Sequence, residues 1–199
     1  MNGHHIHNQQ ITINNPEFLF PTKVISSHDR NFGSYRNEMI QWMDNYIIEH
    51  QTIQASNCGG YQSIASLTIN QSFIPYFERI SEQIFSTVDF YIKDTNLDKL
   101  DICNMWFNYN YQNCYNTTHI HPGAVLSGVL WVQIPDNDAV LGFECPNAYA
   151  SDVINKVTNR QFNPLEGTMV IFPSHIPHRV DINRSKTPRI SVSFNLRLP

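Results

Sequence analysis

The sequence "HIHPGAVLSGVLWVQIP" (His119–Pro135) joins a pair of histidines to an apolar run that ends at a turn signal. The run from Val125 to Pro135 is short and rich in β-branched and aromatic residues, which favours a buried strand. The histidines stand at positions i and i+2, and side chains at this spacing point to the same face of a strand. The stretch therefore predicts a buried strand and, just before it, two imidazoles that can be aimed at one point.

Short apolar runs of the same kind fill the chain after Lys99, separated by turn signals such as "PDND" (135–138) and "PLEG" (164–167). The further runs are "ICNMWFNYN" (102–110), "AVLGFEC" (139–145), "GTMVIFP" (167–173), "HRVDI" (178–182) and "RISVSFNLRL" (189–198). Their spacing and composition predict an antiparallel β-sandwich or barrel.

The first part of the chain has two stretches whose apolar residues recur every three to four positions, which predicts two amphipathic helices. One covers 34–51, with Ser34 as a possible N-cap, and the other covers 72–94 and begins near Pro75. The apolar positions are Met39, Ile40, Met43, Tyr46, Ile47 and Ile48 in the first helix, and Phe77, Ile80, Ile84, Val88 and Tyr91 in the second. "QITINN" (10–15) and "LFPTKVIS" (19–26) are predicted to be short strands.

Length and composition favour one globular domain over 1–199, because 199 residues with 41% hydrophobic and 15% charged side chains suffice for one core. We expect 1–99 to supply N-terminal strands and two supporting helices, and 100–199 to form the β-rich core. The net charge of -4 gives no basic footprint for nucleic acid or a membrane surface. No secretory signal, membrane span or Cys-x-x-Cys pair is visible in the sequence, so we expect reduced thiols and a cytoplasmic protein.

Four histidines lie in the β-rich part, and three of them are candidate metal ligands. His119 and His121 form the pair described above, and His178 follows the proline-rich turn "PSHIPH" (173–178), in which His175 is the competing candidate. Imidazole binds iron, zinc, copper and nickel alike, so the spacing does not choose the metal. On the last strand, Arg189 shares a face with Ser191 and Ser193, and a buried guanidinium favours a carboxylate partner.

The order His-x-His, distal His, Arg-x-Ser resembles the Fe(II)- and 2-oxoglutarate-dependent dioxygenases. More narrowly, the chain is similar to the 2OG-Fe(II) oxygenases of marine bacteria and phages. The similar segments are "SNCGGYQS" (56–63), "MWFNYN" (105–110), "HIHPGAVLSGVLWV" (119–132), "GTMVIFPSHIPHRV" (167–180) and "RISVSFN" (189–195). If the chain is phage-encoded, its cytoplasmic location is that of the host cell.

The resemblance implies a mainly β fold with flanking helices, a double-stranded β-helix (jelly roll, or cupin-like barrel). It implies that His119 or His121, together with His178, holds Fe(II). It implies that Arg189 and Ser191 bind 2-oxoglutarate. The pocket is then lined by Asn108, Asn110 and Trp131. The implied activity is hydroxylation of a protein side chain or a small molecule with O2, releasing succinate and CO2.

The usual ligand set of two histidines and one carboxylate is not visible at the expected spacing, and three alternatives stay open. His121 is itself the third ligand, which we favour. Alternatively, His121 is the first ligand, Gly123 occupies the carboxylate position and a water completes the site. Finally, Glu144 in "GFECP" (142–146) supplies a carboxylate from another strand.

Two other kinds of protein remain as alternatives. A cupin-type metal enzyme also uses His-x-His and a distal histidine, but the glutamate expected shortly after the pair is missing from "PGAVLS" (122–127). A non-enzymatic β-sandwich binding module is the second. The hydroxylation substrate is unknown, we expect no nucleic-acid or membrane partner, and a homodimer is left open.

Overall fold

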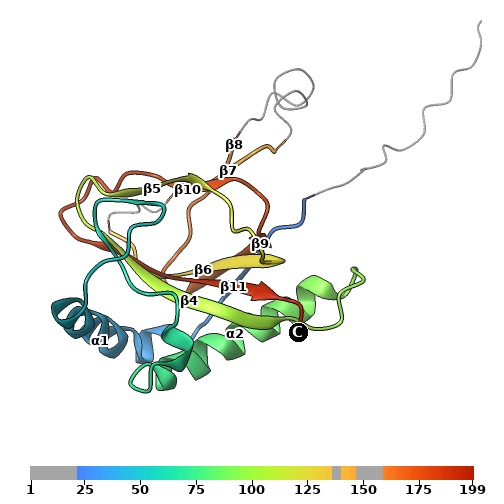
Figure 1. The fold of residues 1–199 in the computed structure, drawn as a ribbon, viewed down its shortest axis with the longest axis horizontal. Helices are drawn as coiled ribbons and strands as arrows, with labels where there is room; N and C mark the ends of the chain where they lie inside the picture. Colours follow the sequence, from blue (N-terminus) through green and yellow to red (C-terminus); the bar gives the residue numbers. More distant parts are fainter. Residues whose placement is uncertain (1–21, 136–139, 147–158) are drawn as a thin grey trace, which may run out of the picture.

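The computed structural model describes residues 22–135, 140–146 and 159–199. The predicted strand "QITINN" (10–15) and most of the predicted turn "PDND" lie outside these residues. Two antiparallel sheets face each other, and Figure 1 shows the smaller one lying over the larger one. None of the described helices is long and apolar enough to span a membrane.

The larger sheet has six strands in the order β1-β9-β6-β11-β4-β3. Their bounds are β1 Ile25–His28, β9 Thr168–Pro173, β6 Leu126–Gln133, β11 Arg189–Arg197, β4 Asp101–Asn110 and β3 Tyr61–Gln62. The smaller sheet has five strands in the order β2-β5-β10-β7-β8. Their bounds are β2 Asn57–Cys58, β5 Tyr115–His119, β10 His178–Val180, β7 Leu141–Glu144 and β8 Asn159–Phe162. The antiparallel sandwich expected from the sequence is therefore confirmed.

Each predicted apolar run after Lys99 coincides with a strand, whereas four strands were not predicted: β2, β3, β5 and β8. The strand β5, "YNTTH", consists of polar residues, and only one of the five is buried. Apolar alternation therefore gives no signal for it, although it carries His119.

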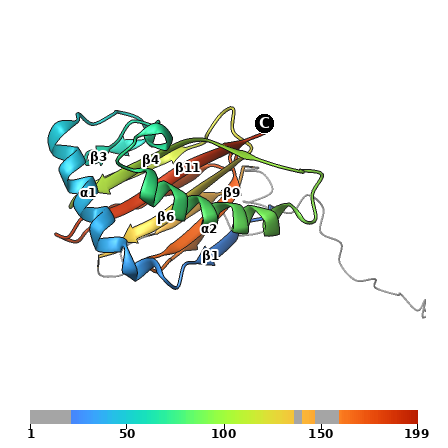
Figure 2. The same ribbon diagram turned by 90° about the horizontal axis from the view of Figure 1, so that it is seen from below.

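Both predicted helices form, α1 over Arg36–Glu49 and α2 over Ile74–Ile92. Figure 2 shows them crossing the same outer face of the larger sheet. The expectation that Ser34 caps α1 is wrong, because Ser34 ends a short 3-10 helix, Phe32–Ser34, and Tyr35 takes the N-cap position. Phe32 is buried and anchors this turn, which delays the start of α1. Ile48 was also misplaced, since it is 82% exposed.

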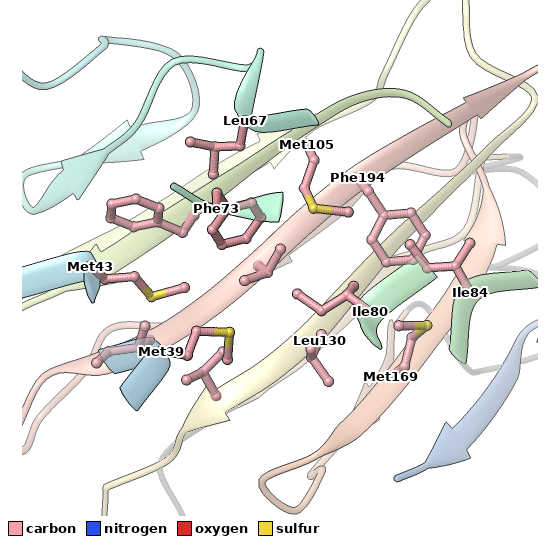
Figure 3. Packing of buried hydrophobic residues seen from close by; sticks show 14 of the residues in the cluster. Met39, Met43, Leu67, Phe73, Ile80, Ile84, Met105, Leu130, Met169 and Phe194 are labelled. Carbon is pink, nitrogen blue, oxygen red and sulfur yellow. The ribbon is translucent and has the colours of Figure 1, made fainter. Parts of the chain in front are cut away.

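The main core lies between the helices and the larger sheet. Figure 3 shows Met39 of α1 and Ile80 of α2 among Leu130 of β6, Met169 of β9 and Phe194 of β11. All five side chains are fully buried. Alternate residues of these strands point the other way, toward the smaller sheet. The larger sheet thus gives one face to the hydrophobic core and the other to the interior between the sheets, where the polar residues gather.

Gly128 interrupts the buried run of β6 because of a close approach. A Cβ atom at this position would lie 2.2 Å from Cζ of Phe194, which is the directly paired residue on β11. The glycine therefore lets the tip of the Phe194 ring approach β6 closely, where any side chain would displace it.

Candidate metal centre and adjoining pocket

Three histidines converge between the two sheets, with one ring nitrogen of each lying within 4.8 Å of the others. His119 ends β5 and His178 begins β10, and the two residues are directly paired across these strands. The ring centroids of His119 and His178 lie 4.3 Å apart, and Nε2 of His121 lies 3.1 Å from Nε2 of His178. The histidine pair and the distal histidine expected from the sequence are therefore brought together. His175, the competing candidate, is exposed.

His121 reaches this group in a different way from the one expected. The spacing predicts two residues of one strand, whereas β5 ends at His119 and His121 lies in the loop that follows. The backbone N–H of His121 donates to the carbonyl of Ser174, 2.9 Å away, at the end of β9. This bond connects the loop of His121 to the segment that leads to His178. His121 therefore meets the other two histidines through a hydrogen bond between two loops.

The Nδ1 hydrogen bonds of His119 and His178 leave a lone pair on the Nε2 atom of each ring, as a metal ligand requires. Nδ1 of His119 lies 2.7 Å from the carbonyl of Thr117, and Nδ1 of His178 lies 2.9 Å from the carbonyl of Ile176. A carbonyl only accepts, so both Nδ1 atoms carry the proton and both Nε2 atoms carry a lone pair. Metal-bound histidines commonly have such a second bond, which fixes the ring orientation.

Burial keeps these imidazoles neutral. Desolvation is the main cause of a lowered pKa in all three histidines. The pKa of His121 falls to about 4 and that of His178 to about 3. The nearby His119 adds to the shift of the other two. Neutral imidazole is the form that binds a metal, so the donor set fits Fe(II) without loss of protons at neutral pH.

The geometry also bears on the missing carboxylate. The carboxylate of Glu144 accepts a hydrogen bond from Oγ1 of Thr118 at 2.8 Å and pairs with Nη1 of Arg179 at 3.2 Å. Thr118 alternates with His119 on β5, so these contacts lie on the side of the strand away from the histidines. Gly123 has a φ of +85°, which explains a glycine there without any role at a metal.

A small cavity of about 40 Å³ lies beside the histidines. Asn108 and Ser191, both expected from the sequence, are among the residues that line it. Asn110, Trp131 and Arg189 do not line it, but they lie on the same strands: Arg189 pairs with Asn110, and Trp131 pairs with Ser191. The candidate 2-oxoglutarate residues thus lie together, at one side of the histidines.

These residues suit a planar anion. Arg189 is 1% exposed, and its Nη2 donates to the carbonyl of Asp181 at 2.7 Å. Within the described residues, Nε1 of the fully buried Trp131 and Oδ1 of Asn108 have no hydrogen-bond partner. A buried donor without a partner is costly, and a carboxylate would satisfy the indole N–H while pairing with the guanidinium. The residues present therefore fit 2-oxoglutarate.

Several polar residues of the interior were missed. Trp106 and Asn116 line the cavity beside the residues that the sequence indicated, which include Ser193 on the face of Arg189 and Ser191. The signal was present in "NMWFNYN" (104–110), in which alternate residues, from Asn104 to Asn110, share one face of β4.

A family model described as "Putative 2OG-Fe(II) oxygenase" matches residues 104–195. No curated protein matches the chain.

Among solved structures, a Pseudomonas putida prolyl-4-hydroxylase is similar, with 13% identity, a TM-score of 0.56, and coverage of 87% of this chain and 93% of that one. A prolyl hydroxylase from Trichoplax adhaerens, in complex with a hypoxia inducible factor peptide, shares 12% identity with a TM-score of 0.62, covering 87% and 83%. HygX from Streptomyces hygroscopicus, with nickel and 2-oxoglutarate bound, shares 9% identity with a TM-score of 0.60, covering 88% and 83%. These likenesses confirm the predicted double-stranded β-helix.

Proposed function

We propose that the chain is a 2OG-Fe(II) oxygenase, which uses Fe(II), 2-oxoglutarate and O2, and that it hydroxylates an unactivated C–H bond at an iron held by three histidines. The match of the oxygenase family model to residues 104–195 supports this proposal. The ligands in this proposal are His119, His121 and His178. The observation that carries it is the convergence of three imidazole nitrogens within 4.8 Å. The two alternatives, a cupin-type metal enzyme and a non-enzymatic module, do not account for the family match.

The proposed reaction converts R–H, O2 and 2-oxoglutarate into R–OH, succinate and CO2. One oxygen atom of O2 enters the hydroxyl group and the other enters succinate. Bound Fe(II) supplies the chemistry with O2, for which protein side chains have no equivalent. The residue types of this chain are suited to binding, orientation and exclusion of water.

Each group of residues has a separate task in the proposal. The carbonyls of Thr117 and Ile176 hold the rings of His119 and His178 with Nε2 directed inward. Arg189, with Ser191 and the indole N–H of Trp131, holds the far carboxylate of 2-oxoglutarate. Asn108 lines the cavity beside the histidines, and Asn110 lies next to Arg189 across the paired strands.

A set of three neutral imidazoles has a consequence for charge. The centre is one unit more positive than a centre made of two histidines and a carboxylate. Coulomb's law then predicts weaker binding of the cation and stronger binding of the dianionic 2-oxoglutarate. We therefore expect Fe(II) and 2-oxoglutarate to bind with strong positive coupling.

The test is the turnover of 2-oxoglutarate to succinate with Fe(II) and ascorbate, together with anaerobic titrations of both cofactors. The protein should lack residues 1–8, because His4, His5 and His7 can bind metal nonspecifically. Succinate formation that requires Fe(II), and metal binding that requires the three histidines, are expected. Absence of both turnover and cofactor binding would overturn the proposal.

A further inference from the structure

A groove of about 420 Å³ opens beside His119 and His121. It adjoins the small cavity that Asn108 and Ser191 line, and His119, His121 and Trp106 border both. The face of β11 that points between the sheets gives the order of these sites. Arg189 lies at one end of the strand, Ser191 and Ser193 line the small cavity, and Asn195 lines the groove. Six residues of strand span roughly 20 Å. The groove therefore lies on the other side of the histidines from Arg189.

Three amide side chains, one from each of three neighbouring strands, line this groove, which we call the amide groove. They are Gln62 of β3, Asn104 of β4 and Asn195 of β11. Asn104 and Asn195 are directly paired across their strands, so their side chains lie next to each other.

The amides of this groove have spare hydrogen-bonding capacity. Gln62 and Asn195 are each only 7% exposed. Oδ1 of Asn104 is buried and has no hydrogen-bond partner among the described residues. Oδ1 of Asn195 accepts from Oγ of Ser127 at 2.7 Å, which leaves its Nδ2 as a donor. Because polar groups that are buried without partners are costly, this arrangement favours a ligand that supplies them.

Among the described residues, the amide groove is lined by no acidic or basic side chain apart from His119 and His121. Its remaining walls are Ala55, Ser56, Ala65, Trp106, Thr117 and Ile120. A charged ligand group would lose its hydration here without gaining an ion pair. The groove therefore selects against charged ligands.

We propose that the amide groove binds an uncharged polypeptide segment as the substrate for hydroxylation, an inference that rests on the function proposed above. A primary amide offers a donor and an acceptor together, which matches the N–H and C=O of a peptide backbone. The groove is open to the surface, which admits a chain that continues at both ends, and its volume falls within the roughly 300–1,000 Å³ typical of ligand sites.

The side chain to be oxidised has a defined place in this proposal. The indole of Trp106 is 8% exposed, and its centroid lies 5.7 Å from that of His121. An apolar side chain laid on this ring is next to the proposed iron ligand. Ile120, 45% exposed, adds an apolar contact at the rim of the groove.

The first experiment measures succinate formation with pools of hexapeptides that have blocked termini. One pool contains only uncharged residues, a second contains lysine at one position, a third contains aspartate, and a fourth sample holds neutral oligosaccharides. We expect the uncharged peptides to raise succinate formation severalfold above the rate without substrate and to gain the mass of one oxygen atom. If oligosaccharides alone raise the rate, or if no sample does, the amide groove does not bind a peptide.

The rate without any added substrate separates the two proposals. Succinate formed from 2-oxoglutarate and O2 with Fe(II), and with ascorbate as the reductant in place of a substrate, supports the proposed function, whatever the peptide pools do. If this background turnover and cofactor binding are both absent, the proposed function fails first. If the background is present and no pool changes it, only the inference about the amide groove fails.

The second experiment changes the charge of the groove with Asn104→Asp. Because a carboxylate here would favour a cationic partner, we expect stimulation by uncharged peptides to fall by about tenfold and stimulation by lysine peptides to rise. Asn96→Asp, at an exposed position after α2, is the matched control and should leave both unchanged. A general loss of stability cannot produce a gain with lysine peptides. Equal behaviour of the two variants would overturn the inference.

Discussion

Nε2 of His121 lies 3.1 Å from Nε2 of His178, although the two residues are 57 positions apart in the chain. Nδ1 of His178 is engaged with a backbone carbonyl, so its Nε2 presents a lone pair toward His121. These two imidazoles, with that of His119 beside them, could hold a shared cation.

Replacing His119 with alanine should weaken Fe(II) binding by more than the roughly 10–100-fold that outer-shell changes produce, since a direct ligand is lost. Anaerobic calorimetry, or the visible spectrum of the Co(II) form, measures this change. His175→Ala is the matched control, because that histidine is exposed and lies in the same turn as His178.

The same titration separates the three alternatives for the missing carboxylate. Glu144→Gln should leave Fe(II) affinity close to that of the wild type, because its carboxylate is engaged with Thr118 and Arg179. If His119→Ala binds iron normally, the three-histidine site is wrong. A loss of iron binding in Glu144→Gln would instead favour a carboxylate ligand.

Replacing Arg189 with alanine should weaken 2-oxoglutarate binding by roughly 10–100-fold, since a hydrogen bond to a charged group contributes about 1.5–3 kcal/mol. The dissociation constant is measured anaerobically from the absorbance of the Fe(II)–2-oxoglutarate complex. Arg197→Ala is the control, because this residue is exposed on the same strand. Equal 2-oxoglutarate affinity in both variants would contradict the role proposed for Arg189.

The metal-free protein should lose stability as the pH falls from about 6.5 toward 4. The folded-state pKa is lowered to about 4 for His121 and to about 3 for His178, so the unfolded chain binds more protons over this range. Thermal unfolding of chelated protein, followed by circular dichroism at several pH values, measures the effect. The double variant His121→Asn/His178→Asn should flatten the dependence, whereas His28→Asn should not. An unchanged slope in the double variant would refute this cause.

Gly128→Ala should destabilise the fold by about 1–3 kcal/mol through overpacking, which for a chain of this size is roughly 2–4 °C in Tm per kcal/mol. The added Cβ would meet the ring of Phe194 at 2.2 Å. Gly33→Ala is the matched control, since a Cβ there has nothing within 4 Å. Truncating the ring in Gly128→Ala/Phe194→Leu should recover part of the loss, and no recovery would point to a different cause.

The sequence by itself determined the parts of this protein that depend on local patterns. Apolar alternation and turn residues gave the runs that became β4, β6, β7, β9, β10 and β11, and three-to-four spacing gave α1 and α2. The period of two along a strand also correctly predicted that Arg189 and Ser191 share one face of β11. The order of the motifs could be compared with that of the oxygenase family, because only a few residue types bind iron or a carboxylate.

The tertiary structure decided what depends on pairing between distant segments. The polar strand β5 exists because β2 and β10 pair with it, and no apolar signal marks it. His121 joins the other histidines through a backbone bond to Ser174, and Glu144 is held by Thr118 and Arg179. The amide groove forms because the pairing of β3, β4 and β11 brings Gln62 and Asn195 to one surface. Hydrophobic periodicity is a property of neighbouring residues, whereas these contacts follow from sheet register and loop hydrogen bonds, which a single sequence does not encode locally.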